Sequence, residues 1–211
     1  MVIIEDILSS NIKSDKHIMA YTTCDFSPLN VNNPISKHKG LLLKDILSLE
    51  FFNNKRDIFN NVYKELLTEI QDTKPNDLYY RLSELNIPII TETIDGLHRK
   101  AGNENTIELY GSLTNLQCTT CCTYHSAFQQ AFTTGTLLCP LCHQQLRPAV
   151  VLFGESVNNL CIALNEIYKA DYLFVFGNSF NIWPANQIFM KAIASKCKIV
   201  YCHPTNSSEL P

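Results

Sequence analysis

Two closely spaced pairs of cysteines constrain the fold of this chain more than any other feature of its sequence. Cys118 and Cys121 form the first C-x-x-C pair, and Cys139 and Cys142 form the second. Each pair can form a tight turn that directs two thiolates at one point, and two such turns complete the tetrahedral four-sulfur shell of a structural Zn²⁺ site. The spacing therefore predicts one structural zinc ion.

The alternatives to a zinc site are free cysteines in a core or two disulfides. The chain has nine cysteines, and those outside the two pairs are scattered without the spacing of a disulfide framework. This distribution favours a reducing compartment. Cys122 and His143 each follow one of the pairs directly and are alternative ligands, although the symmetrical C-x-x-C set is the preferred one.

The length and charge of the chain exclude several classes of function. With 211 residues, the chain can form one good core and a small additional module. Its net charge of -3 offers no basic surface, so we expect no direct binding of nucleic acid. Glu5 and Asp6 occupy the place where a signal peptide carries basic residues, and no apolar run approaches the ~18–20 residues of a membrane span. We expect an intracellular protein, cytoplasmic or nuclear, that is not secreted and does not bind membranes.

Strand-like and helix-like segments alternate along the chain. Helical patterns are predicted at 1–14, 40–73, from 75 onward, at 158–169 and at 184–195, and strands at 17–22, 87–93, 106–110, 149–153, 172–176 and 198–202. Several strands are continuously apolar, as strands buried on both faces are. The prediction is a doubly wound, mostly parallel α/β sheet with ligands beyond the carboxyl ends of its strands, and a zinc module inserted between the strands at 106–110 and 149–153.

Within the helical segment 40–73, four apolar residues are spaced four apart. Ile58, Val62, Leu66 and Ile70 are therefore predicted to lie on one face of a helix that packs against the core.

Four motifs, in order along the chain, resemble those of the sirtuins, the NAD-dependent protein-lysine deacylases. TETIDGLHRKAG at 91–102 resembles T-Q-N-I-D-G-L-H…A-G, and IELYGS at 107–112 is similar to E-L-H-G-S. LRPAVVLFGE at 146–155 matches L-R-P-x-V-V-x-F-G-E, and ADYLFVFGNSFNIWPA at 170–185 resembles A-D-L-x-x-x-x-G-T-S-L-x-V-x-P-A. The four paired cysteines stand where the family's zinc ligands stand.

The resemblance implies a domain organisation and an activity. A Rossmann-like NAD-binding domain is expected at 1–112 and 147–211, with a helical insertion at about 40–75, and a zinc-ribbon-like module at 113–146. The expected ligands are NAD and an acylated-lysine protein or peptide. The expected reaction converts acyl-lysine and NAD into nicotinamide, O-acyl-ADP-ribose and free lysine.

The residue at the family's catalytic position differs in this chain. Tyr110 stands where the sirtuins have the histidine that acts as general base. An unperturbed tyrosine has a pKa near ~10, so only ~0.1% is phenolate at pH 7, and loss of a positioned base typically lowers the rate by ~10²–10⁴. Impaired catalysis is therefore expected, and the alternative is a pseudoenzyme that binds acyl-lysine peptides or proteins. His98, in the I-D-G-L-H motif, is interpreted as structural, and His125 as a surface residue.

The NAD-binding loop also differs. Where the sirtuins have T-G-A-G-I-S, this chain has TTCDFS at 22–27, so that Thr23 and Asp25 replace two glycines. Those glycines let the backbone approach the pyrophosphate, so either the loop is rebuilt or NAD binds weakly. The resemblance implies these cofactor-binding positions: Thr22, Ser27, Glu92, Thr93, Asp95, Gly177, Ser179 and His203.

The last motif residues with an implied role belong to the peptide site. Val151, Phe153 and Glu155 stand where the family holds its substrate peptide by strand addition between the two modules. The alternative for Val151 and Phe153 is simple burial in the core.

Overall fold

The computed structural model describes residues 15–29, 37–38, 40–134, 137–157, 159–177 and 183–202. The helix predicted at 1–14 lies outside the described residues, as do two of the expected cofactor-binding positions, Ser179 and His203. None of the helices in the described ranges combines the length and the apolar character needed to cross a membrane.

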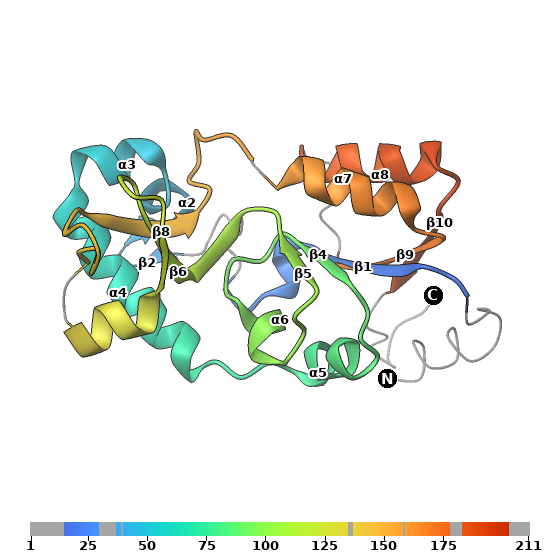
Figure 1. Ribbon diagram of the computed structural model, residues 1–211, viewed down its shortest axis with the longest axis horizontal. Coiled ribbons are helices and arrows are strands. Elements are labelled where there is room, and N and C mark those ends of the chain that lie inside the picture. Colours follow the sequence, from blue (N-terminus) through green and yellow to red (C-terminus); the bar gives the residue numbers. More distant parts are fainter. Residues whose placement is uncertain are drawn as a thin grey trace.

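A parallel five-stranded sheet forms the centre of the molecule (Figure 1). Its strands are β1 (Ile18–Thr22), β4 (Ile89–Thr91), β5 (Thr106–Glu108), β9 (Tyr172–Phe176) and β10 (Lys198–Cys202), in the order β10-β9-β1-β4-β5. The chain continues from β1 to β4 on one side, and β9 pairs with β1 on the other. The strand order therefore reverses at β1, and this is the place where open parallel sheets bind ligands at their carboxyl edge.

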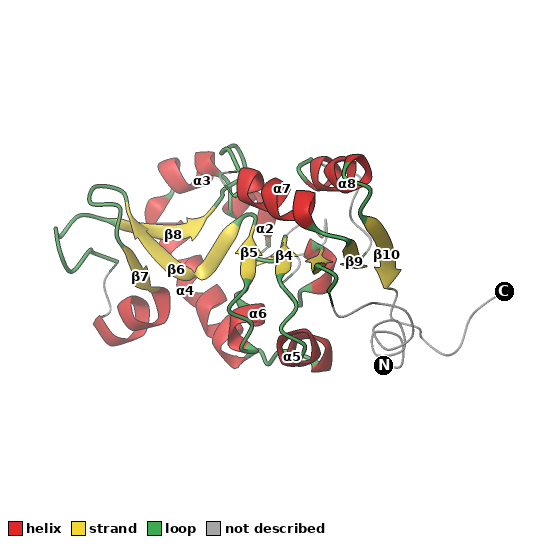
Figure 2. Cartoon of the chain, turned by 45° about the vertical axis from the view of Figure 1, so that its right-hand side comes forward, coloured by secondary structure: helices red, strands yellow, loops and turns green. Residues whose placement is uncertain are grey.

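Helices cover both faces of this sheet (Figure 2). On one face α7 (Leu160–Lys169) and α8 (Ala185–Ala194) pack on Met19, Tyr21 and Val175. On the other face α5 (Asp77–Glu84) packs on Ala20 and Phe174, and α6 (Leu97–Lys100) lies beside α5. Alternating residues of β1 and β9 thus enter two separate cores, as expected for strands buried on both faces. The predicted doubly wound α/β fold is confirmed.

A second, antiparallel sheet forms a smaller lobe with the segment before α5. It contains β6 (Gly111–Cys118), β7 (Tyr124–Ser126) and β8 (Leu146–Val150), in the order β7-β6-β8. Its apolar side shares one core with α2 (Leu43–Ile46), α3 (Leu49–Asn54) and α4 (Arg56–Asp72). The remaining described elements are the hairpin of β2 (Lys37–His38) and β3 (Leu41–Leu42), the 3₁₀ turn η1 (Cys24–Phe26) and the π-helical segment η2 (Gln129–Thr134).

The strand predicted at 149–153 is wrong in both position and partner. The strand is β8, at Leu146–Val150, and it pairs with β6 in the small sheet rather than with the large sheet. Beyond it, the N–H of Val151 donates to the carbonyl of Tyr110 at 2.8 Å and the N–H of Phe153 to that of Leu47 at 2.9 Å. The apolar run therefore leaves the sheet and joins the two lobes.

The apolar stripe predicted for 40–73 also needs one correction. Val62, Leu66 and Ile70 are buried in α4, but Ile58 is 49% exposed and Phe59 is buried instead. Residues spaced four apart do not stay on one side of a helix with 3.6 residues per turn. Over three turns the buried face therefore moves by about one residue. The domain limits remain a prediction. Those at 112 and 147 both fall inside strands of the small sheet.

Candidate functional site

Polar side chains gather at the carboxyl ends of β1 and β4. The two strands pair in register up to Thr22 and Thr91, so the residues that follow them emerge side by side. The hydroxyl of Thr22 donates to that of Thr91 at 2.7 Å, and the Thr91 hydroxyl accepts from the N–H of Thr93 at 3.0 Å. Thr22, Thr91 and Thr93 are all buried. These buried hydrogen bonds hold the ends of the two strands in place, at the carboxyl edge where an α/β sheet binds its ligands.

The loop after β1 is rebuilt around a 3₁₀ turn, which is one of the two outcomes expected from the loss of its glycines. Thr23 has φ -81° and Ser27 has φ -84°, and the turn between them does not enter the left-handed region. The loop is anchored to the neighbouring strand, because the N–H of Thr23 donates to the carbonyl of Phe176 at 3.0 Å. The loop therefore carries no backbone strain from the replacement of glycine.

Gly177, at the end of β9, lies directly against this rebuilt loop. Its φ is +109°, and a Cβ added there would lie 1.7 Å from the hydroxyl oxygen of Thr23 and 2.8 Å from a carboxylate oxygen of Asp25. Only glycine permits this close approach of β9 to the loop. The side chains of Thr23 and Asp25 thus pack directly against the end of β9 at Gly177.

Glu92 is a buried carboxylate that holds the β1 loop in place. One of its oxygens accepts a hydrogen bond from the Tyr21 hydroxyl at 2.7 Å, and the other accepts from the N–H of Cys24 at 3.0 Å. Burial raises the pKa of Glu92, and the hydrogen bonds from Tyr21 and Cys24 oppose that rise because they stabilise the charged form.

Asp95, three residues after Glu92, is a second buried carboxylate that binds the β1 loop. One carboxylate oxygen accepts from the N–H of Leu97 at 2.9 Å, and the other accepts from the hydroxyl of Ser27. Burial raises the pKa of Asp95, and the bond from Ser27 works against that rise. Ser27 and Asp95, which the resemblance implied as cofactor positions, are thus in contact and join the β1 loop to the start of α6.

His98 is buried next to the same network. Its Nε2 lies 3.0 Å from the hydroxyl oxygen of Thr22, and its ring stacks on Phe26 with the centroids 5.8 Å apart. Burial lowers the pKa of His98 to about 3, so the ring is neutral at physiological pH. Its Nδ1 has no hydrogen-bond partner among the described residues. This environment is that of a buried neutral ring, in agreement with its interpretation as structural.

A cavity of about 210 Å³ lies between the two lobes, beside this edge of the large sheet. Apolar side chains form most of its wall, and Tyr110 packs against both the core of the large sheet and the core of the small lobe. Burial, followed by the nearby Glu92 carboxylate, raises the pKa of Tyr110, so its hydroxyl is neutral at physiological pH. The residues that line the cavity are Leu47, Glu92, Ile94, Tyr110, Val150, Val151, Leu152, Phe153, Gly154, Glu155, Val157 and Trp183.

The cavity brings together residues that the sequence assigned to three different roles. Tyr110 was expected at the catalytic position, Glu92 at the cofactor site, and Val151, Phe153 and Glu155 at the peptide site. Trp183 also lines the cavity, and no signal in the sequence indicates this. It is the only tryptophan in the chain, but its position beside the segment 150–157 depends on the fold.

The expected peptide segment is not simple core. Phe153 is 47% exposed, and Glu155 forms a bidentate salt bridge with Arg147 at 2.6 and 2.7 Å. Partial burial raises the pKa of Glu155, but the hydrogen bonds from Arg147 outweigh burial and hold the pKa below its usual range. The N–H groups of Val151 and Phe153 are already used within the chain, so strand addition at this segment remains a prediction.

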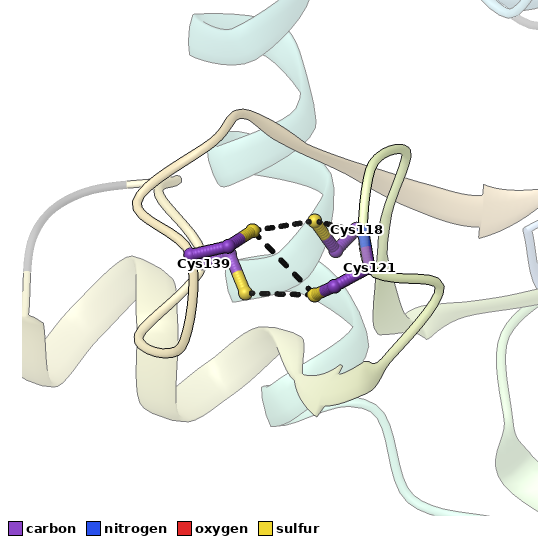
Figure 3. Close-up of side chains that lie close together, drawn as sticks. Cys118, Cys121 and Cys139 are labelled. Carbon is purple, nitrogen blue, oxygen red and sulfur yellow. Dashed lines mark hydrogen bonds between the residues drawn. The ribbon is translucent and has the colours of Figure 1, made fainter.

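The four paired cysteines converge at the end of the small sheet, where two turns face each other (Figure 3). Their sulfur atoms all lie within 4.8 Å of one another. The Sγ of Cys118 is 3.4 Å from that of Cys142, and the Sγ of Cys121 is 3.6 Å from that of Cys139. These separations are too long for disulfides, whose S–S length is about 2.05 Å. Four convergent thiols fit a tetrahedral structural Zn²⁺ ion, which is the chemistry that the spacing predicted.

The two neighbouring candidates, Cys122 and His143, close the C-x-x-C turns. The N–H of Cys122 donates to the carbonyl of Cys118 at 3.1 Å, and the N–H of His143 donates to that of Cys139 at 2.9 Å. Both residues have a φ of 58°, so each C-x-x-C turn closes on a left-handed residue. Cys122 and His143 are exposed and stand outside the sulfur cluster.

His125, interpreted from the sequence as a surface residue, and Thr123, to which the sequence assigned no role, both lie beside the cluster. The Nε2 of His125 lies 3.5 Å from the Sγ of Cys139 and 2.9 Å from the hydroxyl of Thr123, which in turn lies 3.1 Å from the Sγ of Cys121. His125 is therefore not a plain surface residue. Polar groups of this kind orient metal ligands and adjust their basicity.

The residues present also fit one end of an NAD molecule. The cavity, the buried carboxylate of Glu92 and the unpartnered Nδ1 of His98 all lie at the carboxyl edge of a parallel sheet, where dinucleotides bind. In that position the cavity residues Glu92 and Tyr110 would contact the nicotinamide and ribose end.

Comparison with known proteins places these features in one family. The sequence profile of the Sir2 family matches residues 33–184. A NAD-dependent protein deacetylase of Saccharolobus solfataricus is 32% identical over 192 residues, which cover 86% of this chain and 78% of that protein. A solved structure of Sir2 bound to an acetylated peptide superposes with a TM-score of 0.71 at 25% identity, covering 87% of this chain and 79% of the other.

A further structural relative carries a substitution of particular interest. It is a Sir2 protein with a histidine-to-tyrosine mutation, in complex with a p53 peptide and NAD. It superposes with a TM-score of 0.69 at 26% identity, and the match covers 87% of this chain and 79% of that one.

Proposed function

Because this chain belongs to the Sir2 family, we propose that it is an NAD-dependent protein-lysine deacylase with reduced turnover. The observation that carries the proposal is the cavity of about 210 Å³ between the lobes, which joins Glu92 and Tyr110 to the segment 150–155. A single cavity thus connects the expected cofactor end with the expected peptide segment. The names of the relatives, a deacetylase and a Sir2 protein bound to an acetylated peptide, support this reading.

In this proposal an acyl-lysine side chain enters between the lobes and lies against the apolar wall of the cavity. Val150 and Leu152 provide apolar surface, while Phe153 and Trp183, which are about half exposed, stand at its mouth. Val151, Phe153 and Glu155 hold the peptide on either side of the lysine. The described residues that line the cavity include no lysine or arginine, so this part of the wall favours neutral acyl groups over acidic ones.

The cofactor end of the site is formed by the polar edge of the large sheet. Thr22, Glu92 and Thr93 would face the nicotinamide and ribose, with Ser27 and Asp95 holding the loop above them. Bound NAD would supply an electrophilic ribose carbon and nicotinamide as the leaving group. Gly177, and by resemblance Ser179 and His203, would face the adenosine end.

Two features support reduced turnover. Tyr110 stays neutral at physiological pH because its pKa is raised, so it does not accept a proton as the family's histidine does. Thr23 and Asp25 narrow the phosphate crevice, and the Asp25 carboxylate repels the pyrophosphate, so NAD binds more weakly than a glycine loop would allow. The structurally similar Sir2 protein with a histidine-to-tyrosine mutation is complexed with both peptide and NAD, which supports retained ligand binding in this proposal.

The second candidate function is that of a pseudoenzyme that binds acyl-lysine peptides without reaction. The observation that favours it is the pair of independent changes, at Tyr110 and at the Thr23–Asp25 loop, in an otherwise preserved scaffold. In that case the four-cysteine site and the cavity serve binding alone.

The experiment that separates the two functions is a nicotinamide-release assay with NAD and an acetyl-lysine peptide, using protein loaded with one zinc ion per chain. The deacylase proposal predicts release above the rate measured with an unacylated peptide, at a rate reduced by about 10²–10⁴ from that of a relative with histidine at the base position. Peptide binding without any nicotinamide release would establish the pseudoenzyme.

A further inference from the structure

We infer that Glu92 is the proton acceptor in the cavity beside Tyr110, taking the role that Tyr110 does not fill. The inference rests on the proposed deacylase function, and it assigns to Glu92 the proton transfer on which the reduced turnover depends. Among the described residues that line the cavity, three have a titratable side chain: Glu92, Tyr110 and Glu155.

Tyr110 and Glu155 are both unsuited to accept a proton. The Tyr110 hydroxyl is neutral, and its conjugate base is disfavoured by burial and by the adjacent Glu92 carboxylate. Glu155 is ionised, but its two oxygens are held by Arg147 at 2.6 and 2.7 Å, and one of them also accepts from the N–H of Leu152 at 2.8 Å. A carboxylate in a bidentate guanidinium pair is a weak base.

His98, the buried histidine nearest this edge, does not compete for the role. It does not line the cavity, and it is packed between Phe26 and Tyr79, whose ring centroids lie 5.8 and 4.5 Å from its own. Its pKa of about 3 makes it a weak base at physiological pH.

Glu92 has the position, the orientation and the free acceptor site that the role needs. The Tyr21 hydroxyl at 2.7 Å and the Cys24 N–H at 3.0 Å fix its carboxylate, and Glu92 is one of the residues that line the cavity. The Cys24 side chain also donates a hydrogen bond to the carboxylate. An ionised carboxylate has about four acceptor sites, so these three bonds leave about one for a ligand. Burial away from water also makes it a stronger base than an exposed glutamate.

The step itself is a single proton transfer. A hydroxyl group of the bound ligand gives its proton to a Glu92 carboxylate oxygen, and the electron pair of the broken O–H bond stays on the ligand oxygen. Glu92 becomes a neutral carboxyl, and it returns the proton to water when the products leave. The ionisable groups around it are Tyr21 on β1, Cys24 and Asp25 in the β1 loop, and Tyr110 after β5.

The first test is a kinetic comparison of three variants by nicotinamide release from NAD and an acetyl-lysine peptide. Glu92→Gln keeps the size of the side chain and should lower kcat by about 10²–10⁴ with little change in KM. It should also remove the acidic limb of the pH profile of kcat, while Glu92→Asp should restore part of both. Glu108→Gln is the matched control, because Glu108 is a largely buried carboxylate with a raised pKa that pairs with Arg99 and lies outside the cavity.

The second test is independent of activity. A carboxyl with a raised folded-state pKa makes the fold less stable as the pH rises from the unfolded to the folded pKa, because the native state binds more protons there. The difference in urea-unfolding free energy between wild type and Glu92→Gln should therefore fall as the pH rises above the ordinary pKa of a glutamate, and level off once the pH has passed the raised pKa of Glu92 in the folded state. A curve that has levelled off at the pH of the kinetic assay shows that Glu92 is ionised there.

Each outcome bears on the inference. Turnover that survives in Glu92→Gln overturns it and leaves the deacylase function standing. A stability difference that continues to change above pH 8 also overturns it, because Glu92 would then be protonated at working pH. Wild-type protein that binds the peptide but releases no nicotinamide overturns the proposed function and the inference together.

Discussion

At the scale of single residues, Gly177 is a position that leaves no room for a side chain without a rearrangement. An added Cβ would lie 1.7 Å from the Thr23 hydroxyl oxygen, in a backbone region with φ of +109° that other residues rarely adopt. Gly177→Ala should therefore lower the free energy of unfolding by about 2–5 kcal/mol. Urea denaturation followed by circular dichroism measures this change.

Gly40 provides the matched control for that substitution. Its φ is +85°, but nothing lies within 4 Å of an added Cβ, so Gly40→Ala should lower the free energy of unfolding by only about 1–2 kcal/mol. Thr23→Ala in the Gly177→Ala background should recover part of the loss, because it removes the clashing oxygen. Equal losses at the two glycines would contradict the close contact between β9 and the β1 loop.

Tyr110 gives the second prediction at this scale. Tyr110→His introduces a side chain with a pKa near ~6.5 into the cavity, so a proton acceptor becomes available at neutral pH. We expect kcat for nicotinamide release to rise by about tenfold or more. Tyr168→His, at a tyrosine 64% exposed on α7, should leave kcat unchanged. An unchanged kcat in Tyr110→His would show that proton transfer at this position does not limit the reaction.

At the scale of elements, the cysteine cluster holds together the small sheet. It joins the end of β6 to the segment before β8, and Cys118 and Cys139 are also members of the core shared with α2, α3 and α4. Cys139→Ser should reduce bound zinc well below one ion per chain and lower the free energy of unfolding by about 3 kcal/mol or more. Cys122→Ser, at the exposed neighbour of Cys121, should change neither quantity.

Hydrogen exchange locates that effect within the molecule. Amides of β6, β7 and β8 should lose protection from exchange in Cys139→Ser. Amides of β1 and β9 should keep their protection, because these strands pack in a core separate from that of the small sheet. Loss of protection throughout the chain would mean that the two lobes unfold as one unit. Full zinc binding by the variant would contradict the four-cysteine assignment.

Elements with a clear period or boundary signal were predictable from the sequence. The helix at Asp77–Glu84 begins at Asn76, whose side chain caps it as its residue type suggests, and the apolar strands β1, β9 and β10 lie where predicted. β6 was not predicted, because a register shift between Ser112 and Leu116 breaks the alternation of buried and exposed residues. An apolar run such as 150–153 does not reveal whether it pairs in a sheet or lines a cavity.

The residues of the candidate site also divide into those that the sequence could predict and those that it could not. The clustering of the four cysteines was predictable because it follows from their spacing within each C-x-x-C turn. The partners of Glu92 and the position of Trp183 depend on strands and loops brought together from distant parts of the chain. Such contacts exist only in the folded molecule, so a sequence names the candidate residue without naming what it touches.

At the scale of the whole molecule, the cavity of about 210 Å³ lies between two lobes with separate cores, at the carboxyl edge of the large sheet. The large sheet supplies the buried polar groups, and the small lobe supplies the apolar wall and the peptide segment. The chain belongs to the Sir2 family, and its four clustered cysteines could hold a zinc ion. Tyr110 and the loop at Thr23–Asp25 are the positions on which the proposed reduction in turnover rests. The account therefore depends on whether this edge still binds NAD.

Calorimetric titration of NAD into zinc-loaded protein, with and without a saturating acetyl-lysine peptide, tests that claim most directly. The account predicts one site per chain with a Kd tighter than about 1 mM, which corresponds to a binding free energy near -4 kcal/mol. Glycine at both positions of the loop, in Thr23→Gly combined with Asp25→Gly, should tighten binding by about tenfold, because the crevice widens and a carboxylate is removed. No heat from NAD in the presence of the peptide, in either protein, would contradict the account.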